Sequence, residues 1–206
     1  MLYILDLLGV AIFAVTGAIT AGQKRMDVFG IIVVGTVTAL GGGTTRDLIL
    51  GVKPVFWVSD PIYVIVSMSA GLGTFIYAYY AKPPSKTLLF ADAFGLAIFT
   101  VIGCQRAAKV EDSILMIVVM GIMTGVTGGM IRDVLCGEIP LILRREIYAT
   151  ASLTGGLMFV ILRHVGLHDW LVTMLSVITA LTVRLVSLHW HLSLPIFVDS
   201  NKRHHP

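Results

Sequence analysis

Long apolar runs follow one another along this chain, and short polar segments separate them. A helix needs about 20 mostly apolar residues to cross the hydrocarbon core of a bilayer. Seven segments reach that length. The pattern therefore predicts an all-α membrane protein with seven transmembrane helices, at residues 3–22, 28–50, 61–80, 88–107, 114–136, 147–165 and 169–190.

The chain also repeats itself internally. Residues 6–54 align without a gap with residues 92–140 at a constant offset of 86, with 18 identities in 49 positions. Each copy belongs to a unit of three expected helices. Because three is odd, the second copy starts on the opposite face of the membrane, so we expect two inverted three-helix repeats plus a seventh helix.

The expected domain division follows from this repeat. The two copies occupy residues 1–81 and 88–166, and a linker at 82–87 joins them. The linker contains Pro83 and Pro84, which cannot continue a helix. The seventh transmembrane helix occupies 167–192, and residues 193–206 form a cytoplasmic tail.

The composition agrees with a membrane protein. The 206 residues are 56% hydrophobic and 13% charged, with a mean hydropathy of +0.90. Soluble domains carry about 25% charged residues, so this chain lacks the polar surface to face water on all sides.

The net charge of +3 reports orientation in the membrane, and we expect no nucleic-acid partner. Cytoplasmic loops carry the excess of Lys and Arg. One set of alternate loops holds eight such residues and the other holds four, which predicts an outer N-terminus and a cytoplasmic C-terminus. The larger set is Lys24, Arg25, Lys82, Lys86, Arg144, Arg145, Lys202 and Arg203, and the smaller is Lys53, Arg106, Lys109 and Arg163.

The second helix of each copy carries a stripe of small residues. A four-residue step keeps its members on one helical face, where another backbone can approach closely. Tight packing alone would explain such a stripe. Three consecutive glycines exceed what one packing face needs, so a kinked or unwound helix that lines a water-filled path is the other hypothesis. The candidate pore and kink residues are Gly41, Gly42, Gly43, Thr44, Thr127, Gly128 and Gly129.

An Arg-Asp pair follows the glycines in each copy. An ionised side chain inside a membrane costs several kcal/mol unless it is paired or hydrated, so we expect an Asp6–Arg46 contact and an Asp92–Arg132 contact. Structural ion pairs near helix ends and a gating or vestibule role both fit this pattern. The candidate charge-pair and gating residues are Asp6, Arg46, Asp47, Asp92, Arg132 and Asp133.

The remaining polar residues predict little chemistry. We expect Arg184 to reach the cytoplasmic headgroups or a subunit contact, and Trp57, Trp170 and Trp190 to lie at the membrane interfaces. The sequence contains no nucleotide-binding, hydrolase or zinc-protease motif. We therefore predict no enzyme activity, no catalytic residue and no metal site.

The segments GGGTTRD at 41–47 and TGGMIRD at 127–133 carry a resemblance to the bacterial branch of the trimeric intracellular cation (TRIC) channels, which extends over residues 3–190. It implies a homotrimer in the bacterial inner membrane, with an hourglass pore in each subunit lined by glycine-kinked second and fifth helices. It also implies passive conduction of the monovalent cations K⁺ and Na⁺. No cofactor is implied beyond a permeant cation in the pore and bound membrane lipid. The chain lacks the Lys-Glu-Val motif of animal members, so their lipid-regulation residues are not carried over.

Two other functions remain open from the sequence. Inverted repeats with broken helices also build secondary transporters, so a carrier of a small zwitterion such as glycine is the alternative. A purely structural membrane protein is the third reading, and it leaves the glycine run and the doubled charge pairs without a purpose.

Overall fold

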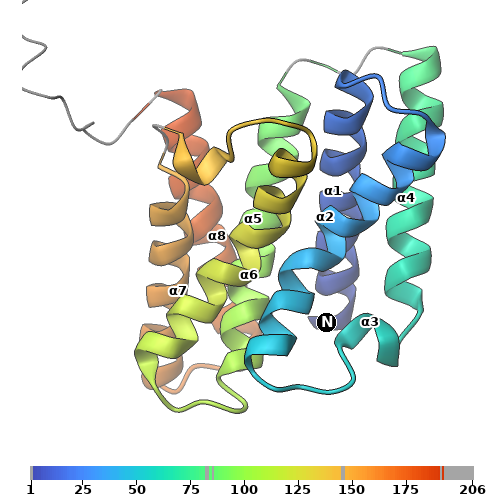
Figure 1. Ribbon diagram of the computed structural model, residues 1–206. Helices are drawn as coiled ribbons and strands as arrows, with labels where there is room; N and C mark the ends of the chain where they lie inside the picture. Colours follow the sequence, from blue (N-terminus) through green and yellow to red (C-terminus); the bar gives the residue numbers. More distant parts are fainter. Residues whose placement is uncertain (1, 82–83, 85, 145–146, 191, 193–206) are drawn as a thin grey trace, which may run out of the picture.

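The computed structural model describes residues 2–81, 84, 86–144, 147–190 and 192, and the regular secondary structure of this part of the chain is entirely helical. Residues 82, 83 and 85 of the expected linker and the expected tail at 193–206 lie outside it. The helices are arranged as one bundle (Figure 1). They are α1 (Leu2–Gln23), α2 (Val28–Ile49), α3 (Phe56–Ser59), α4 (Ile62–Tyr80), α5 (Thr87–Ala107), α6 (Ile114–Leu135), the 3₁₀ turn η1 (Leu141–Leu143), α7 (Ala149–His164) and α8 (Asp169–His189).

The seven long helices match the seven expected segments within two residues at every end. Six of them, all except α7, are long and apolar enough to cross a membrane. Helix α7 has only 16 residues, fewer than the usual length of a membrane span. The short helix α3 was not expected, and it follows α2 in the segment that leads to α4.

The ends of the helices repeat between the two copies. Gly51 and Gly137 follow α2 and α6, and both have a φ of 68°, a left-handed conformation that favours glycine. Val52 N donates to Asp47 O at 2.9 Å, and Glu138 N donates to Asp133 O at 2.8 Å. Each second helix of a copy is therefore closed by the same glycine-dependent turn.

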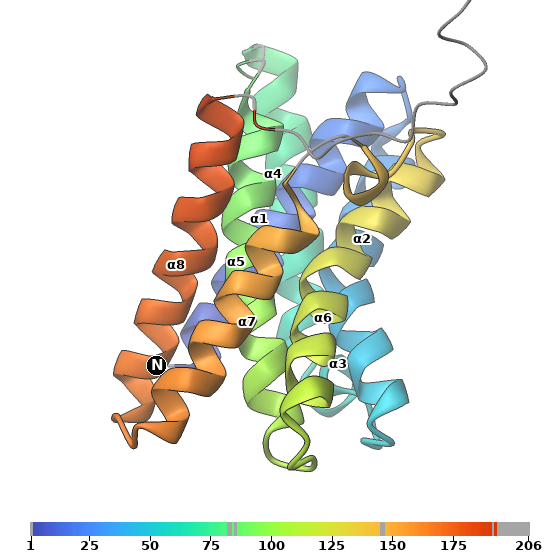
Figure 2. The same cartoon turned by 90° about the vertical axis from the view of Figure 1, so that its left-hand side faces the viewer.

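Helices α2 and α6 run in opposite directions through the bundle. In Figure 1, α2 ends at the lower side of the molecule and α6 ends at the upper side, and the view turned by 90° agrees (Figure 2). The Arg-Asp pair at the end of each helix therefore lies at the opposite end of the molecule from its counterpart. Helix α1 starts at the lower side, and α8 ends at the upper side.

Pairs of glycines bring neighbouring helices together in the same way in both copies. A Cβ atom on Gly17 would lie 2.7 Å from Gly35 Cα, where α1 crosses α2. A Cβ on Gly103 would lie 2.9 Å from Gly121 Cα, where α5 crosses α6. Distances this short exclude any larger side chain, so the stripe of small residues provides the close packing that its spacing predicts.

Candidate functional site

The upper cluster is a group of buried polar residues in the upper half of the bundle. Its Arg132 side chain is fully buried, and its Nη1 lies 2.7 Å from Asp92 Oδ1. Arg132 Nε donates to Asp133 Oδ1 at 2.8 Å, and Nη1 also donates to Thr16 Oγ1 at 3.0 Å. The expected Asp92–Arg132 contact is thus present. The cluster consists of Thr16, Asp92, Arg132, Asp133 and Tyr148.

The lower cluster is the counterpart at the other end of the bundle, and its pairing differs. Arg46 bonds Asp47 Oδ1 through Nε at 2.8 Å and through Nη2 at 2.7 Å. Asp6 instead accepts a hydrogen bond from Tyr63 at 3.0 Å and lies 3.9 Å from Arg106 Nη2. The lower cluster consists of Asp6, Arg46, Asp47, Tyr63 and Arg106.

The expected Asp6–Arg46 contact is therefore wrong. No Arg46 nitrogen lies within 4.0 Å of Asp6 in the described part of the chain. The Arg46 guanidinium lies over the Phe56 ring, 5.6 Å from its centroid, while Tyr63 and Arg106 occupy the position beside Asp6. At the position equivalent to Arg106, the other copy has Thr20. The upper cluster therefore has no arginine at that position that could take the place of Arg132 beside Asp92.

The aspartate of each Arg-Asp pair has a second structural role. Asp47 Oδ2 accepts a hydrogen bond from Phe56 N, and Asp133 Oδ2 accepts one from Leu141 N, both at 2.9 Å. Each carboxylate thus joins its arginine to the segment that follows the helix. A carboxylate that bonds both a guanidinium and a backbone N–H satisfies several of its lone pairs while buried.

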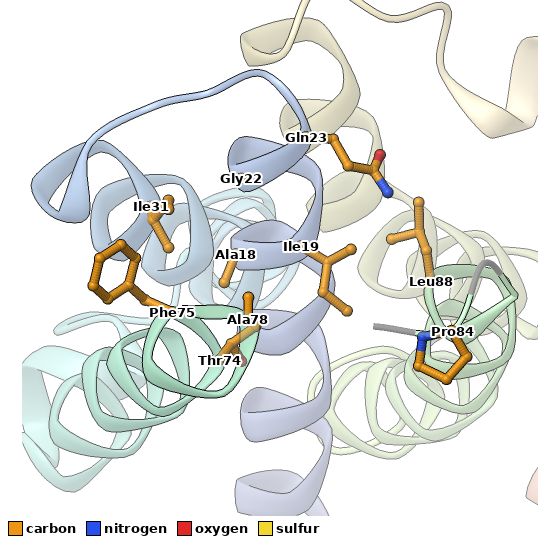
Figure 3. Close-up of a pocket in the computed structure, with 10 residues that line it drawn as sticks. All are labelled: Ala18, Ile19, Gly22, Gln23, Ile31, Thr74, Phe75, Ala78, Pro84 and Leu88. Carbon is orange, nitrogen blue, oxygen red and sulfur yellow. The ribbon is translucent and has the colours of Figure 1, made fainter. Parts of the chain in front are cut away.

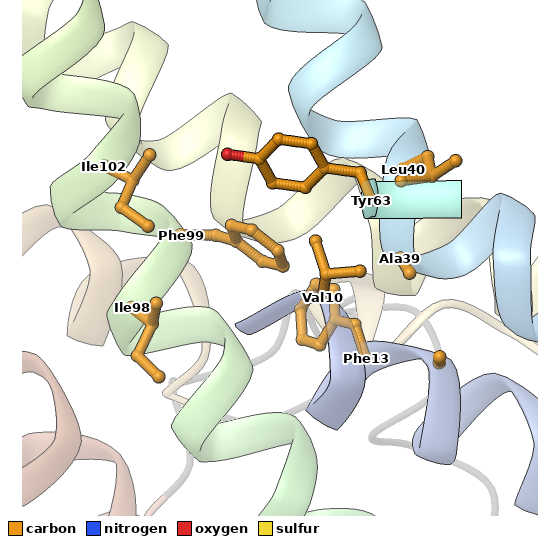
Figure 4. Packing of buried hydrophobic residues seen from close by; sticks show 9 residues of the cluster. Val10, Phe13, Ala39, Leu40, Tyr63, Ile98, Phe99 and Ile102 are labelled. Carbon is orange, nitrogen blue, oxygen red and sulfur yellow. The ribbon is translucent and has the colours of Figure 1, made fainter. Parts of the chain in front are cut away.

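Apolar side chains fill the space between the two clusters. Phe13 and Phe99 are almost fully buried, and their ring centroids lie 5.0 Å apart at an interplanar angle of 61°. Val10, Ile98 and Ile102 pack in the same cluster, as Figure 4 shows. Together with the two rings they form an apolar barrier between the clusters, the Phe13–Phe99 barrier. The structure is therefore polar at two depths and apolar between them.

The three consecutive glycines of α2 pack against two different neighbours. A Cβ atom on Gly41 would lie 2.8 Å from Ile131 of α6, and one on Gly42 would meet the backbone oxygen of Thr124, also in α6. A Cβ on Gly43 would lie 2.6 Å from the Phe56 ring of α3. Close approach on two sides explains why the run is longer than a single packing face requires.

The matching glycines of α6 complete the crossing. A Cβ atom on Gly128 would meet Thr38 O of α2, and one on Gly129 would lie 3.2 Å from the Tyr148 hydroxyl and 3.3 Å from Asp92 Oδ1. Both helices are α-helical through these positions, so the helix does not unwind there. A role of these glycines in lining a pore stays a prediction.

The candidate threonines are engaged or buried. Thr44 Oγ1 donates to Leu40 O at 2.7 Å and accepts from Trp57 Nε1 at 3.0 Å. Thr127 is buried at 8% exposure. Trp57 is therefore partly a structural residue that holds α3 against α2, in addition to its expected place near an interface.

Sequence reasoning missed the two tyrosines of the clusters. Tyr63 bonds Asp6, and Tyr148 lies beside Asp92, although the two tyrosines are 85 positions apart rather than 86. The alignment lost them because one copy is a residue shorter after the Pro54–Pro140 match. Phe56 and Leu141, which bond the two aspartates, share the same offset of 85.

Arg184 of α8 also departs from expectation. It reaches neither a headgroup nor a subunit surface, because its side chain is fully buried. Its guanidinium lies over the Tyr148 ring, 4.8 Å from the centroid, and its Nη1 donates to Ile147 O at 3.4 Å. The seventh long helix thus packs directly behind the upper cluster.

Charged loop residues connect the two copies above the upper cluster. Lys24 Nζ lies 2.5 Å from Glu138 Oε1, and Arg144 Nη2 lies 3.2 Å from Glu138 Oε2. The hydrogen bond from Lys24 is the main reason that the pKa of Glu138 is below its ordinary value, and the charge of Arg144 adds to it. These side chains are exposed, so breaking this loop contact costs less stability than breaking an ion pair of the buried clusters.

An apolar cavity of about 400 Å³ lies beside the upper half of α1, against α2 and α4. Figure 3 shows its lining, which includes Ile19, Ile31 and Phe75 and no charged side chain. The cavity is therefore chemically distinct from the two ion clusters, which contain all the candidate charge-pair residues.

Comparison with known proteins agrees with this arrangement. The family described as "Glycine transporter" matches residues 3–79 and 89–164, one stretch in each copy. A solved structure of the TRIC trimeric intracellular cation channel orthologue from Rhodobacter sphaeroides is similar at 42% identity, with a TM-score of 0.89 over 93% of this chain and 98% of that one. The chain belongs to the TRIC family.

Two further relatives match over nearly the whole chain. A second solved structure, of a TRIC cation channel studied for the structural basis of conductance, is similar at 35% identity. Its TM-score is 0.88 over 96% of this chain and 97% of that one. The UPF0126 inner membrane protein YadS of Escherichia coli K12 is 44% identical, covering 98% of this chain and all of that protein. This TRIC-family chain is thus similar to these relatives over nearly its whole length.

Proposed function

We propose that this protein is an inner-membrane channel that passively conducts monovalent cations, K⁺ and Na⁺, through a pore within each subunit of a homotrimer. The observation that carries the proposal is the likeness over 93% of the chain, at 42% identity, to a solved trimeric cation channel. All seven long helices cross the membrane in this proposal, and two inverted repeats surround the pore. The short α7 spans the membrane with the help of its flanking residues.

The charges of the two clusters are compatible with a cation path. In the upper cluster, two carboxylates, Asp92 and Asp133, face one guanidinium, Arg132. In the lower cluster, Asp6 and Asp47 offset Arg46 and Arg106. The arginines are therefore neutralised by carboxylates, which removes the repulsion that unpaired arginines would exert on a permeant cation.

The upper cluster also offers an oxygen ligand. Asp92 Oδ2 is buried and has no hydrogen-bond partner among the described residues, as is true of Arg132 Nη2. A carboxylate oxygen in this state can replace part of the hydration shell of a cation. The Phe13–Phe99 barrier then corresponds to the narrow middle of an hourglass, closed in this conformation, with the clusters as its two vestibules.

Recordings from purified protein in planar bilayers test the proposal. Step currents that reverse near the K⁺ equilibrium potential under a KCl gradient are expected, with Na⁺ able to carry current in place of K⁺. Bilayers that stay electrically silent, although vesicles with the same preparation contain folded protein, would contradict a channel.

A carrier of a small zwitterion is the second candidate, favoured by the description of the matching family as a glycine transporter. In that case vesicles would show saturable uptake and counterflow of labelled glycine without step currents. The same preparation therefore separates the two functions.

A further inference from the structure

A second polar site lies at the lower end of the molecule, away from both ion clusters. It is a pocket of about 420 Å³ between the C-terminal ends of α5 and α7 and the N-terminal end of α8. None of its lining residues belongs to the upper or lower cluster. Its polar lining is Gln105, Lys109, Arg163, Asp169 and Thr173, and its apolar lining is Leu2, Phe159, Trp170 and Val172.

The pocket carries charges of both signs that do not pair with one another. Lys109 and Arg163 are basic and Asp169 is acidic, yet no ion pair within 4.0 Å joins them in the described part of the chain. Arg163 is held by Ala108 O, 3.3 Å from both Nη1 and Nη2, so most of its N–H donors stay available. Opposite charges separated by a cavity complement a ligand that itself carries both charges.

The side-chain amide of Gln105 adds one hydrogen-bond acceptor to the pocket, and its contacts show which of its two polar atoms this is. Its Nε2 donates to Thr173 Oγ1, and Thr173 Oγ1 donates to Asp169 O at 2.7 Å. Because the amide nitrogen is engaged, the atom left over is Oε1, which is buried and has no partner among the described residues. A buried acceptor without a partner is costly, and a ligand N–H would satisfy it.

We propose that this pocket binds the headgroup of a zwitterionic phospholipid with a primary ammonium group, that is, phosphatidylethanolamine. Lys109 and Arg163 take the phosphate, and Asp169 and Gln105 Oε1 take the ammonium. The pocket lies where three membrane helices end, and Trp170 beside it is 55% exposed, as is typical of a residue at the headgroup level. Leu2, Phe159 and Val172 provide an apolar wall for the first carbons of the acyl chains.

Related headgroups satisfy only part of this site. Phosphatidylglycerol offers a phosphate but no cation for Asp169. Phosphatidylcholine offers both charges, but its quaternary ammonium has no N–H for Gln105 Oε1. The site therefore predicts a preference for phosphatidylethanolamine over both lipids, and a weaker affinity for free phosphoethanolamine, which lacks the acyl chains.

Native mass spectrometry of the purified full-length protein tests this with three lipids of identical acyl chains. Phosphatidylethanolamine should bind most tightly. Lys109→Gln and Arg163→Gln should each weaken it about 1.4- to fivefold, the range for one exposed charge contact. Asp169→Asn should instead remove the preference over phosphatidylglycerol. Lys53→Gln and Asp112→Asn are the matched controls and should change nothing, because they lie outside the pocket lining, in the segments that follow α2 and α5 at the same end of the molecule.

Several outcomes would overturn the proposal. Tightest binding of phosphatidylglycerol, or an unchanged preference in Asp169→Asn, would show that the ammonium is not recognised. Equal affinity for free phosphoethanolamine would mean a soluble ligand rather than a lipid. If a variant fails to fold, the rise in melting temperature of the unmodified protein with each lipid gives the same ranking. Lipid binding is measured without current, so its failure and a failure of the channel proposal are separate results.

Discussion

Phe13 and Phe99 occupy equivalent positions in the two copies and pack edge to face at the centre of the bundle, with ring centroids 5.0 Å apart. The two copies therefore meet through the same residue from each. The upper cluster lies on one side of this contact and the lower cluster on the other. In α1, Phe13 is seven residues from Asp6, or about 10 Å along the helix axis.

If the two rings close the pore, Phe13→Ala should raise the open probability or conductance in planar bilayers. The same change should lower the free energy of unfolding by about 3–5 kcal/mol, because it leaves a cavity in a packed interior. The two effects point in opposite directions, so a gain of current cannot be a by-product of lost stability.

Met120→Ala is the control for this variant. Met120 is also buried, at 2% exposure, but it belongs to an apolar cluster of α5, α6, α7 and α8 that contains neither Phe13 nor Phe99. It should lower stability by a similar amount and leave conductance unchanged. Equal effects of the two variants on current would remove the assignment of the phenylalanine pair as the barrier.

The two ion clusters should differ in a double-mutant cycle on stability. Removing Asp92 or Arg132 alone leaves a buried charge uncompensated and should cost about 3–5 kcal/mol. The double change should recover part of that loss, because the pair is in contact. Asp6→Asn and Arg46→Gln should show a weaker coupling, since Arg46 bonds Asp47 and Asp6 bonds Tyr63, so the two residues interact only at longer range.

Thermal unfolding in detergent measures both cycles. Asp6→Asn combined with Tyr63→Phe should show a coupling of about 1 kcal/mol, the usual contribution of one hydrogen bond. Strong coupling between Asp6 and Arg46 would contradict the pairing of the lower cluster and would mean that it adopts the pairing of the upper one in the detergent-solubilised protein.

The sequence predicted the long helices well, because their boundaries depend on hydrophobic length alone. It also predicted the Asp92–Arg132 pair, since duplicated charges inside a membrane need partners. The Asp6–Arg46 pair was wrong because equivalent residues in the two copies do not have equivalent neighbours. Arg106 lies beside Asp6, whereas its counterpart in the other copy is Thr20. Comparison of the two copies therefore could not predict Arg106, because this partner of Asp6 comes from the second copy and is not repeated in the first.

The glycine run and Arg184 show a second kind of contact that the sequence pattern does not predict. Sequence spacing places residues on a helix face but does not say how many neighbours that face meets. Gly43 packs against Phe56 in a helix of four residues, which is too short to predict from periodicity. Arg184 is buried against Tyr148, a residue that a shift of one position removed from the repeat alignment.

Gly42 should tolerate no side chain. Gly42→Ala would place a Cβ against Thr124 O, a backbone atom that cannot move without shifting α6, so we expect loss of folded protein. Gly73 in α4 is the control, because a Cβ there meets nothing within 4 Å. Gly73→Ala should leave stability unchanged or raise it by about 0.4–1 kcal/mol, because alanine restricts the unfolded chain. A well-folded Gly42→Ala protein, judged by size-exclusion chromatography and melting temperature, would contradict the close crossing of α2 and α6.

The Lys24–Glu138 contact should make stability depend on pH in one direction. The pKa of Glu138 is lowered from an ordinary 4.5, so its contribution is present above that pH and disappears as the pH falls through the lowered pKa. Melting temperatures of the unmodified protein and of Glu138→Gln should therefore differ slightly near neutral pH and converge in acid. High salt should shrink the difference, because the pair is exposed. A difference that grows as the pH falls would contradict the assignment.

The strongest prediction concerns where equivalent residues lie relative to the membrane. Lys53 follows α2 at the lower end of the molecule and Ile139 follows α6 at the upper end, and both are exposed. In a protein without Cys104 and Cys136, Lys53→Cys should react with a membrane-impermeant thiol reagent from outside intact cells. Ile139→Cys should react only after the membrane is opened, because the excess of Lys and Arg predicts that the upper end is cytoplasmic. The reverse pattern would keep the fold and invert the orientation. Three long helices, α4, α5 and α6, separate the loop at Lys53 from the loop at Ile139. Labelling of both positions from one side would require an even number of spans between these loops, and two vestibules on opposite faces of the membrane would then be impossible.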